Sequence, residues 1–278
     1  APGILAWGAV NHDVRAEAGG YRANARWEFA SGVRQASWLG AHVRITEADG
    51  SPRKRPDGSP EIRTILFPLA SATLYDVWDV IGLRGTGTDS YSVDNLFIPE
   101  KFAALRDEPS ALRENGPLYK IPTNAIYSMG FAATSLGVAR AQFDAATELS
   151  RKKTPQGLSA MKENSAVQGL IGLTEAKLRR ARAYLFATAA EVWDDLARGP
   201  FTEGHRLALR LAATSTIHQS TEIVDVAYHM AGATAVFRAN GFERRLRDMH
   251  AINQQLQARD THYEEMGKVI LSGNLAGP

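Results

Sequence analysis

The sequence predicts an α+β protein, in which an antiparallel β-domain over residues 1–104 precedes an antiparallel four-helix-bundle domain over residues 105–278. Two observations predict this class. Up to about residue 100, short segments that alternate polar and apolar residues are separated by Gly, Pro and Asp clusters, as in antiparallel sheets. After Pro99 the pattern changes to long amphipathic stretches, which indicate helices joined by short connections.

The strand predictions follow from the period of two. The clearest strand is Gly20–Phe29, which follows the Gly19-Gly20 turn and alternates apolar with charged or amide side chains. The same pattern predicts strands at Ser37–Thr46, Glu61–Pro68, Thr73–Ile81 and Tyr91–Ile98. The cluster Arg53-Lys54-Arg55 falls in a connection rich in Gly, Pro and Asp, so we expect a solvated hairpin loop there rather than a phosphate-binding patch.

The helix predictions follow from the period of 3.6 residues. The clearest helix runs over Glu163–Leu196, and Arg198-Gly199-Pro200 supplies the cation, glycine and proline that end a helix. Further helices are predicted at Pro122–Ser150, Glu203–Met230, Phe242–Gln257 and Thr261–Leu271. Short connections favour antiparallel packing of these helices, and the domain boundary is expected between Pro99 and Pro117.

Composition excludes several classes of protein. The net charge of +2 over 278 residues is too small to indicate a nucleic-acid partner. No apolar run approaches the ~18 residues that span a bilayer, so we expect no membrane partner. The absence of cysteine excludes disulfides, thiolate metal sites and cysteine nucleophiles, and it fits a cytoplasmic location.

Motifs for common catalytic sites are also absent. The Gly-rich segment Ile81–Tyr91 lacks the Lys-Ser/Thr pair of a phosphate loop and leads into a strand, so we interpret it as a connection. An alternative is that Thr86 and Thr88 face a ligand. The seven histidines show no pair at metal-ligand spacing, and no G-x-S-x-G elbow exists, so neither a metal site nor a serine hydrolase is expected.

The end of the first predicted strand is the best candidate for a binding surface. Ala30-Ser31-Gly32 follows Trp27 and Phe29, so the Ser31 hydroxyl and backbone N–H groups are expected to be accessible beside aromatic rings. Such a surface suits a flat polar heterocycle. The alternative is an ordinary sheet rim in which Gly32 only makes a bulge, and the segment by itself favours neither.

Two polar groupings in the helical half remain open. Five polar residues form one stripe on a predicted helix, which faces either water or a polar seam: Thr214, His218, Thr221, Asp225 and Tyr228. The stretch Phe242–Leu256 carries several arginines with Asp248, and an ion-pair network is the simplest interpretation.

Four segments, taken in order, resemble the acyl-CoA dehydrogenase superfamily, and more closely its flavin-dependent monooxygenase branch. They are spread over nearly the whole chain: Gly19–Gly32, Trp78–Glu100, Ser135–Ala141, and Ala227–Ala233 followed by Arg247–Ile252. The resemblance implies that Trp27, Phe29, Ser31 and Gly32 bind a flavin, with Phe29 and Ser31 against the isoalloxazine ring. It also implies a homotetramer in which the Gly232 turn approaches the cofactor of a neighbouring subunit.

Enzymes of this branch take reduced flavin from a separate flavin reductase and use it with O2 to oxygenate a small aromatic or heteroaromatic substrate. The resemblance therefore implies reduced FMN or FAD as cofactor. The rivals are an acyl-CoA dehydrogenase or oxidase, which needs a carboxylate base that the sequence does not reveal, and a non-catalytic oligomeric relative.

The chain departs from the family pattern in three ways. The family's N-terminal helical domain has no counterpart here, so we expect the chain to be part of a longer protein. Gln255 stands where monooxygenases of this branch often carry a histidine, and its amide can orient a substrate but cannot accept a proton at neutral pH. Arg151–Thr154 retains little of the pyrophosphate-binding motif, which weakens the case for FAD relative to FMN but does not choose between the two.

Overall fold

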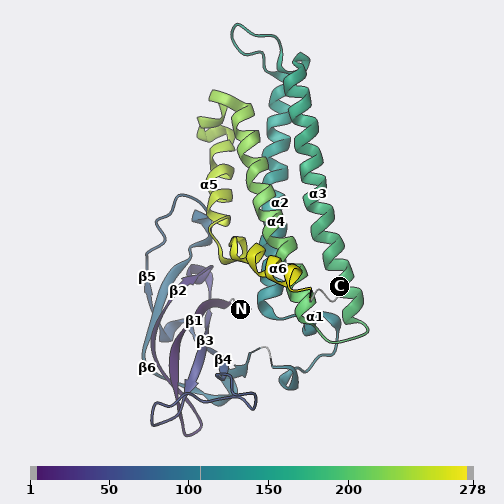
Figure 1. Ribbon diagram of the computed structural model, residues 1–278. Coiled ribbons are helices and arrows are strands. Elements are labelled where there is room, and N and C mark those ends of the chain that lie inside the picture. Colours follow the sequence, from purple (N-terminus) through teal and green to yellow (C-terminus); the bar gives the residue numbers. More distant parts are fainter. Residues whose placement is uncertain (1–4, 107, 274–278) are drawn as a thin grey trace. The chain divides into compact units, whose positions relative to one another are not determined.

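The computed structural model describes residues 5–106 and 108–273 (Figure 1). The chain divides into two compact units. The first contains the residues up to Val80 together with Arg84–Leu112, and the second contains Ile81–Leu83 together with the residues from Arg113 onwards. The first unit is a sheet and the second is helical, so the predicted α+β class is confirmed.

The sheet unit has seven strands in the order β5-β6-β2-β1-β3-β4-β7. The strands are β1 (Leu5–Glu17), β2 (Gly20–Ala30), β3 (Trp38–Thr46), β4 (Ile62–Pro68), β5 (Thr73–Tyr75), β6 (Asp89–Pro99) and β7 (Ala103–Leu105). Every neighbouring pair is antiparallel except β1 with β3, which run parallel. Alternation along one strand does not reveal this exception, because strand direction depends on the partner.

The core of the sheet unit is built on aromatic residues of the central strands. Trp27 of β2 is fully buried, and its ring centroid lies 5.3 Å from that of Tyr91 and 6.1 Å from that of Phe67. The Tyr91 hydroxyl donates to the Gly40 carbonyl at 2.6 Å, which satisfies the one polar group of that ring. The alternating pattern of β2 therefore places the ring of Trp27 in the core of the sheet unit.

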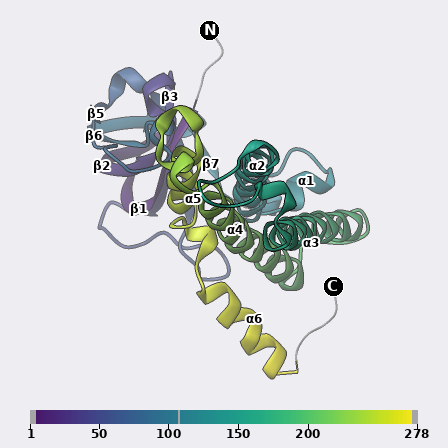
Figure 2. The same ribbon diagram turned by 90° about the horizontal axis from the view of Figure 1, so that it is seen from above.

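The helical unit contains α1 (Pro117–Lys120), α2 (Thr123–Lys152), α3 (Ser165–Leu196), α4 (Glu203–Ala231), α5 (Phe242–Ile252) and α6 (Thr261–Leu271). The three long helices lie side by side, with α4 packed against α2 and α3 (Figures 1 and 2). Short 3-10 turns separate α4, α5 and α6. No helix among the described residues is long and apolar enough to cross a membrane.

Polar caps fix the ends of two long helices. The Asn164 side chain accepts from the backbone N–H groups of Ala166 and Val167 at the start of α3. Thr202 and His205 form a capping box at the start of α4. These caps place both helix starts close to the positions that the sequence predicts.

The predicted fourth helix, Phe242–Gln257, is shorter than expected. It ends as α5 at Ile252, and a separate 3-10 turn covers Leu256–Ala258. The side chain of Gln255 accepts a hydrogen bond from the backbone N–H of Gln257 at 2.7 Å and so begins this new turn. A polar side chain that competes for the backbone in this way ends a helix earlier than periodicity suggests.

Candidate functional site

Phe29 occupies a strained position at the end of β2. Its φ of +59° lies in the left-handed region, which costs roughly 1–2 kcal/mol for an L-residue. The pairing of β2 with β6 shifts register between Trp27 and Ala30, so Phe29 sits in a bulge. The strained conformation turns the ring outwards and leaves it 69% exposed. An exposed aromatic ring held under backbone strain indicates a functional surface rather than a packing site.

Three hydroxyl groups form a chain beside Phe29. The Oγ1 atom of Thr88 lies 2.9 Å from Ser31 Oγ and 2.6 Å from Thr86 Oγ1. Because the central hydroxyl has one proton, it donates to one neighbour and accepts from the other. Reversing the direction of these two hydrogen bonds changes the Ser31 hydroxyl from a donor to an acceptor for a bound ligand. We call Phe29, Ser31, Gly32, Thr86 and Thr88 the hydroxyl rim.

The backbone of the hydroxyl rim is less available than predicted. The N–H of Gly32 donates to the Thr86 carbonyl at 2.8 Å, and the N–H of Ser31 donates to the Phe29 carbonyl at 3.1 Å. The expectation that these two N–H groups serve a ligand is therefore wrong. Gly32 has a φ of +79°, so its glycine identity allows the tight turn that brings Ser31 to the Thr88 hydroxyl.

Asp89 organises the other side of the hydroxyl rim and was not singled out in the sequence. Its buried carboxylate accepts from Arg34 and from the backbone N–H groups of Val77 and Trp78, both at 3.0 Å. The hydrogen bond from Arg34 is the main cause that holds the pKa of Asp89 below its usual value. These bonds hold Trp78, whose ring centroid lies 6.5 Å from that of Phe29 in a T-shaped pair.

The segment after β5 is consequently not the strand that the sequence predicts. The predicted strand Thr73–Ile81 ends at Tyr75, because the N–H groups of Val77 and Trp78 bond the Asp89 carboxylate instead of a neighbouring strand. The only sequence signal for this role was a lone aspartate inside a Gly- and Thr-rich connection.

Trp27, also predicted to bind cofactor, lies inside the sheet core. Its side chain is fully buried against Tyr91 and Phe67, so its indole does not form part of the rim surface. What remains exposed at the strand end is Phe29, with Ser31 and Gly32 next to it. The structure thus brings Phe29, Ser31 and Gly32 together, and places Trp27 beneath them as support.

In the helical unit, Gln255 lies in the connection between α5 and α6. Its Oε1 atom is the acceptor in the 2.7 Å bond from the Gln257 N–H, so its Nε2 group is the donor left for a ligand. The side chain is half-buried. Gln255 can therefore orient an acceptor atom of a bound molecule, which agrees with an orienting role and not with a proton-accepting one.

A histidine and carboxylate pair joins α5 to α4. His250 Nε2 is 2.9 Å from Asp225 Oδ1, and the two side chains are 45% and 38% exposed. The residues appear in the sequence as members of separate polar groupings on α4 and α5. Only the packing of α5 against α4 joins them into a pair, so no local signal could have found it.

The polar stripe of α4 mostly faces other residues of the chain. Thr214 Oγ1 lies 2.8 Å from both the Gln257 carbonyl and His262 Nδ1, and Thr214 is fully buried. His218 Nε2 lies 2.8 Å from the Ala258 carbonyl, and its Nδ1 lies 3.1 Å from the Tyr263 hydroxyl. We call these residues the α4 seam. Of the two alternatives, the polar seam is correct for Thr214 and His218.

Gly232 ends α4 in a conformation that suits glycine. Its φ of +55° and ψ of −143° form the turn after Ala231, and Lys153 Nζ donates to the Ala231 carbonyl at 2.8 Å. The same ammonium donates to Thr234 Oγ1 at 3.0 Å. A cation at the negative end of the helix dipole stabilises this exposed turn. Its approach to a neighbouring subunit stays a prediction.

Arg247 and Asp248 hold the short segment Ile81–Leu83, which belongs to the helical unit. Arg247 donates to the Ile81 carbonyl, and Asp248 Oδ1 accepts from the Leu83 N–H at 2.7 Å. A Cβ atom at Gly82 would lie 2.1 Å from the Arg247 carbonyl oxygen, so only glycine fits there. The expected ion-pair network is present only in part, as Arg247 with Glu243. Arg247 and Asp248 instead bind mainly the backbone of Ile81–Leu83.

Within residues 5–106 and 108–273, no cluster of three or more His, Cys, Asp or Glu side chains could hold a metal ion. The hydroxyl rim instead offers an exposed ring, a second ring at right angles and a reversible hydroxyl. This set suits the face and polar edge of a flat heterocycle such as an isoalloxazine ring.

A seven-stranded sheet followed by long packed helices is the architecture of acyl-CoA dehydrogenase-like proteins. Residues 129–259 match the family model described as acyl-CoA dehydrogenase, C-terminal domain. The expected resemblance to the acyl-CoA dehydrogenase superfamily, and more closely to its flavin-dependent monooxygenase branch, is thus confirmed as a resemblance.

Indole-3-acetate monooxygenase from Pseudomonas putida is 25% identical over 254 residues, which cover 91% of this chain and 63% of that protein. XiaF from Streptomyces sp., solved with FADH2 and glycerol, has a TM-score of 0.85 at 19% identity, over 99% of this chain and 70% of XiaF. FMN-bound TdsC from Paenibacillus sp. A11-2 has a TM-score of 0.77 at 20% identity, over 98% of this chain and 71% of TdsC. The likeness to these structures shows the fold.

Other curated relatives are named as oxygenase subunits of flavin-dependent monooxygenases. The chain spans 63%, 61% and 60% of the length of three of the curated relatives that it matches. The activity of the whole protein is accordingly a proposal, made from the hydroxyl rim and the helical unit.

Proposed function

We propose that this chain is the oxygenase component of a two-component flavin-dependent monooxygenase. Reduced FMN or FAD and O2 would oxygenate a small aromatic, heteroaromatic or related substrate. Two kinds of observation support the proposal. The hydroxyl rim has groups that suit a flat heterocycle, and several curated relatives carry names of monooxygenases, two of them for indole-3-acetate, although one is named a putative acyl-CoA dehydrogenase.

The observation that carries the proposal is the strained, exposed ring of Phe29. A bulky residue at φ +59° costs free energy, and its outward ring recovers little of it through burial, since 69% remains exposed. A stacked ligand would bury that ring and offset the cost. Ser31, two residues on, would bond the polar edge of the same ligand.

The other residues have supporting roles in this proposal. Bound reduced flavin would supply the electrons for the reaction with O2. Asp89 would keep Trp78 in place beside Phe29, and the Thr88 hydroxyl would set whether Ser31 donates or accepts. Gln255 would donate from Nε2 to a substrate oxygen or nitrogen and orient the substrate. Gly32 and Gly232 would allow close approach of the cofactor.

The proposal includes a separate flavin reductase as partner, a homotetrameric assembly and a cytoplasmic location. The names of relatives as oxygenase subunits support the reductase. Large apolar side chains on α3 support a subunit contact, since Leu173, Phe186 and Trp193 are 56%, 54% and 46% exposed. Measurement of the molar mass in solution by light scattering tests the tetramer.

The experiment that tests the function is an anaerobic titration of the protein with reduced FMN and reduced FAD, followed by admission of O2 and a panel of phenols and indoles. We expect binding of a reduced flavin and oxygen-dependent formation of a hydroxylated product. Phe29→Ala should weaken flavin binding by about 10- to 100-fold, the usual value of one stacking contact. Phe97→Ala is the matched control, because Phe97 is a partly exposed phenylalanine on β6.

Two outcomes would contradict the proposal. Reduction of bound flavin by an acyl-CoA without any need for O2 would support the dehydrogenase or oxidase. Binding of neither oxidised nor reduced flavin would support the non-catalytic relative.

A further inference from the structure

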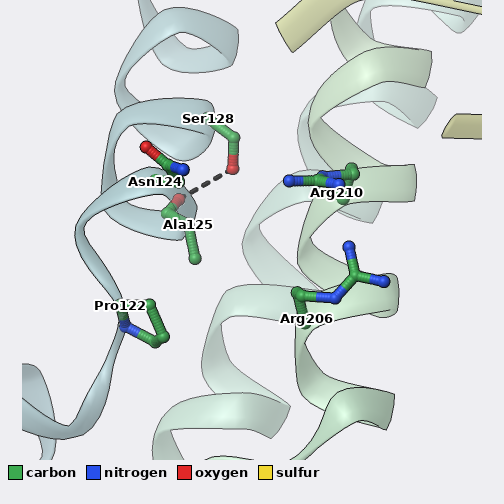
Figure 3. A pocket seen from close by; sticks show the side chains of 6 residues that line it. All are labelled: Pro122, Asn124, Ala125, Ser128, Arg206 and Arg210. Atoms are coloured by element: carbon green, nitrogen blue, oxygen red, sulfur yellow. Dashed lines mark hydrogen bonds between the residues drawn. The ribbon is translucent and has the colours of Figure 1, made fainter. Parts of the chain in front are cut away.

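A small hollow of about 130 Å³ lies between the start of α2 and the first half of α4 (Figure 3). Its α2 side is formed by Pro122, Asn124, Ala125 and Ser128, and its α4 side by Arg206 and Arg210. Figure 3 shows Arg210 directed from α4 towards Ser128, with the guanidinium of Arg206 beneath it. No acidic residue is among the residues that line this hollow.

The two arginines differ in how firmly carboxylates hold them. Arg206 bonds Glu203 at 2.5 Å and Glu265 at 2.5 Å, and both contacts raise its pKa. Among the described residues, Glu265 is the one carboxylate that Arg210 reaches, at 3.5 Å, which is the long limit of a hydrogen bond. Since Glu265 is already engaged by Arg206, the guanidinium of Arg210 has donors available towards the hollow.

The start of α2 adds to the positive potential. This helix has 30 residues, begins after Pro122 without a side-chain cap, and has no acidic residue in its first turn. Its dipole therefore places partial positive charge at the same end as the hollow. Arg206 is compensated by Glu203 and Glu265, so Arg210 is the cation whose charge is least compensated at the hollow.

A second, larger depression of about 500 Å³ shares Arg210 with the first. Its lining includes Leu256, the residue directly after Gln255, and His262 of α6. Three cations, Arg210, Arg259 and Lys268, outnumber the two carboxylates, Glu264 and Glu265, in this lining. Its volume lies within the range of small-molecule sites. Arg210 thus lines both a hollow too small for an aromatic molecule and a larger depression whose lining residue Leu256 follows Gln255 in the sequence.

We propose that Arg210 binds the carboxylate group of a small organic acid in the α2–α4 hollow, with the body of the acid in the larger depression. The planar guanidinium matches a carboxylate through two parallel N–H donors. The identification of this acid as the substrate rests on the proposed monooxygenase function, whereas the carboxylate site does not. The proposal narrows the substrate class to aromatic acids.

The test is calorimetric titration of the flavin-free protein with benzoate, with benzamide as the neutral analogue and inorganic phosphate as the alternative anion. We expect benzoate to bind and benzamide to bind at least tenfold more weakly. Arg210→Gln should weaken benzoate binding at least tenfold. Arg210→Lys should give an intermediate loss, because lysine keeps the charge but lacks the two parallel N–H donors of the guanidinium.

Arg179→Gln is the control for the loss of one positive charge, since Arg179 is a 79% exposed residue on α3 that pairs with Glu175. It should bind benzoate as the wild type does. Circular dichroism should show unchanged helix content in each variant. Absence of benzoate binding, equal binding by Arg210→Gln, or phosphate binding tenfold tighter than benzoate would each overturn the proposal. Flavin titration of Arg210→Gln, expected to match the wild type, separates this result from failure of the proposed function.

Discussion

The hydroxyl rim and the α4 seam use similar groups in opposite ways. Both contain a threonine hydroxyl in a hydrogen-bonded group, yet Thr214 of the seam is fully buried and the rim keeps Phe29 69% exposed. In the seam, the Thr214 hydroxyl has partners in Gln257 and His262. In the rim, a hydroxyl chain ends at exposed Ser31 beside a strained backbone. Satisfied polar groups stabilise a fold, whereas strained and exposed ones indicate a ligand.

The largest effect on the free energy of unfolding is expected at Trp27, which offers a buried ring to compare with the exposed ring of Phe29. Trp27→Ala removes a fully buried ring and should lower the free energy of unfolding of the sheet unit by about 3–5 kcal/mol. Phe29→Ala, only two residues away, should leave that free energy within about 0.5 kcal/mol of wild type, because its ring is exposed. Urea denaturation followed by tryptophan fluorescence and circular dichroism measures both. A large loss of stability in Phe29→Ala would mean that the ring is structural.

The next largest effect tests the buried side of the comparison. Thr214→Val leaves the Gln257 carbonyl and His262 Nδ1 without this partner and should destabilise the helical unit by about 1–3 kcal/mol. Thr221→Val is the control, because its hydroxyl bonds only the Ile217 carbonyl within α4. Thermal unfolding followed at 222 nm measures both. Equal melting temperatures for the two variants would show that the α4 seam adds little to the stability of the helical unit.

A smaller effect is expected at the exposed end of the hydroxyl chain. Ser31→Ala should weaken binding of reduced flavin by about tenfold, as expected for one lost hydrogen bond. Its stability should stay near wild type, because the Ser31 side chain lies at the surface. Fluorescence titration with flavin measures the affinity. If Ser31→Ala lowered the stability and left the flavin affinity unchanged, the hydroxyl rim would have a structural role like that of the α4 seam.

The smallest effect is a pH dependence within the seam. Burial is the main cause that lowers the pKa of His262 from its usual 6.5, and the nearby Arg210 adds to it. The unfolded chain therefore binds this proton at a higher pH than the folded chain does. The stabilisation is complete above pH 6.5 and is lost as the pH falls through the folded pKa.

The check is the difference in unfolding free energy between wild type and His262→Gln from pH 7.5 to pH 5. The wild type should lose more stability than the variant as the pH falls. Parallel curves for the two proteins would contradict the role given to His262.

Much of the fold was predictable because it depends on local periodicity. The boundaries of α3 and α4 follow from caps and helix-ending residues such as Asn164 and Gly199, which act on their immediate neighbours. The failures have a common cause. The strand over Thr73–Ile81 stops at Tyr75 because of Asp89, and α5 stops at Ile252 because Gln255 begins a new turn. In both, a polar side chain takes backbone groups that periodicity assigns to regular structure.

The sequence by itself determined the α+β class, the family resemblance and the position of the strand end at Phe29, Ser31 and Gly32, because residue order and short-range patterns are enough for these. Tertiary structure alone decided the rest. It brought Thr88 and Asp89 to that strand end, joined Asp225 to His250, and placed Arg210 opposite Ser128. Hydrogen bonds and cavities depend on distances between residues far apart in the chain, and packing of strands and helices sets those distances.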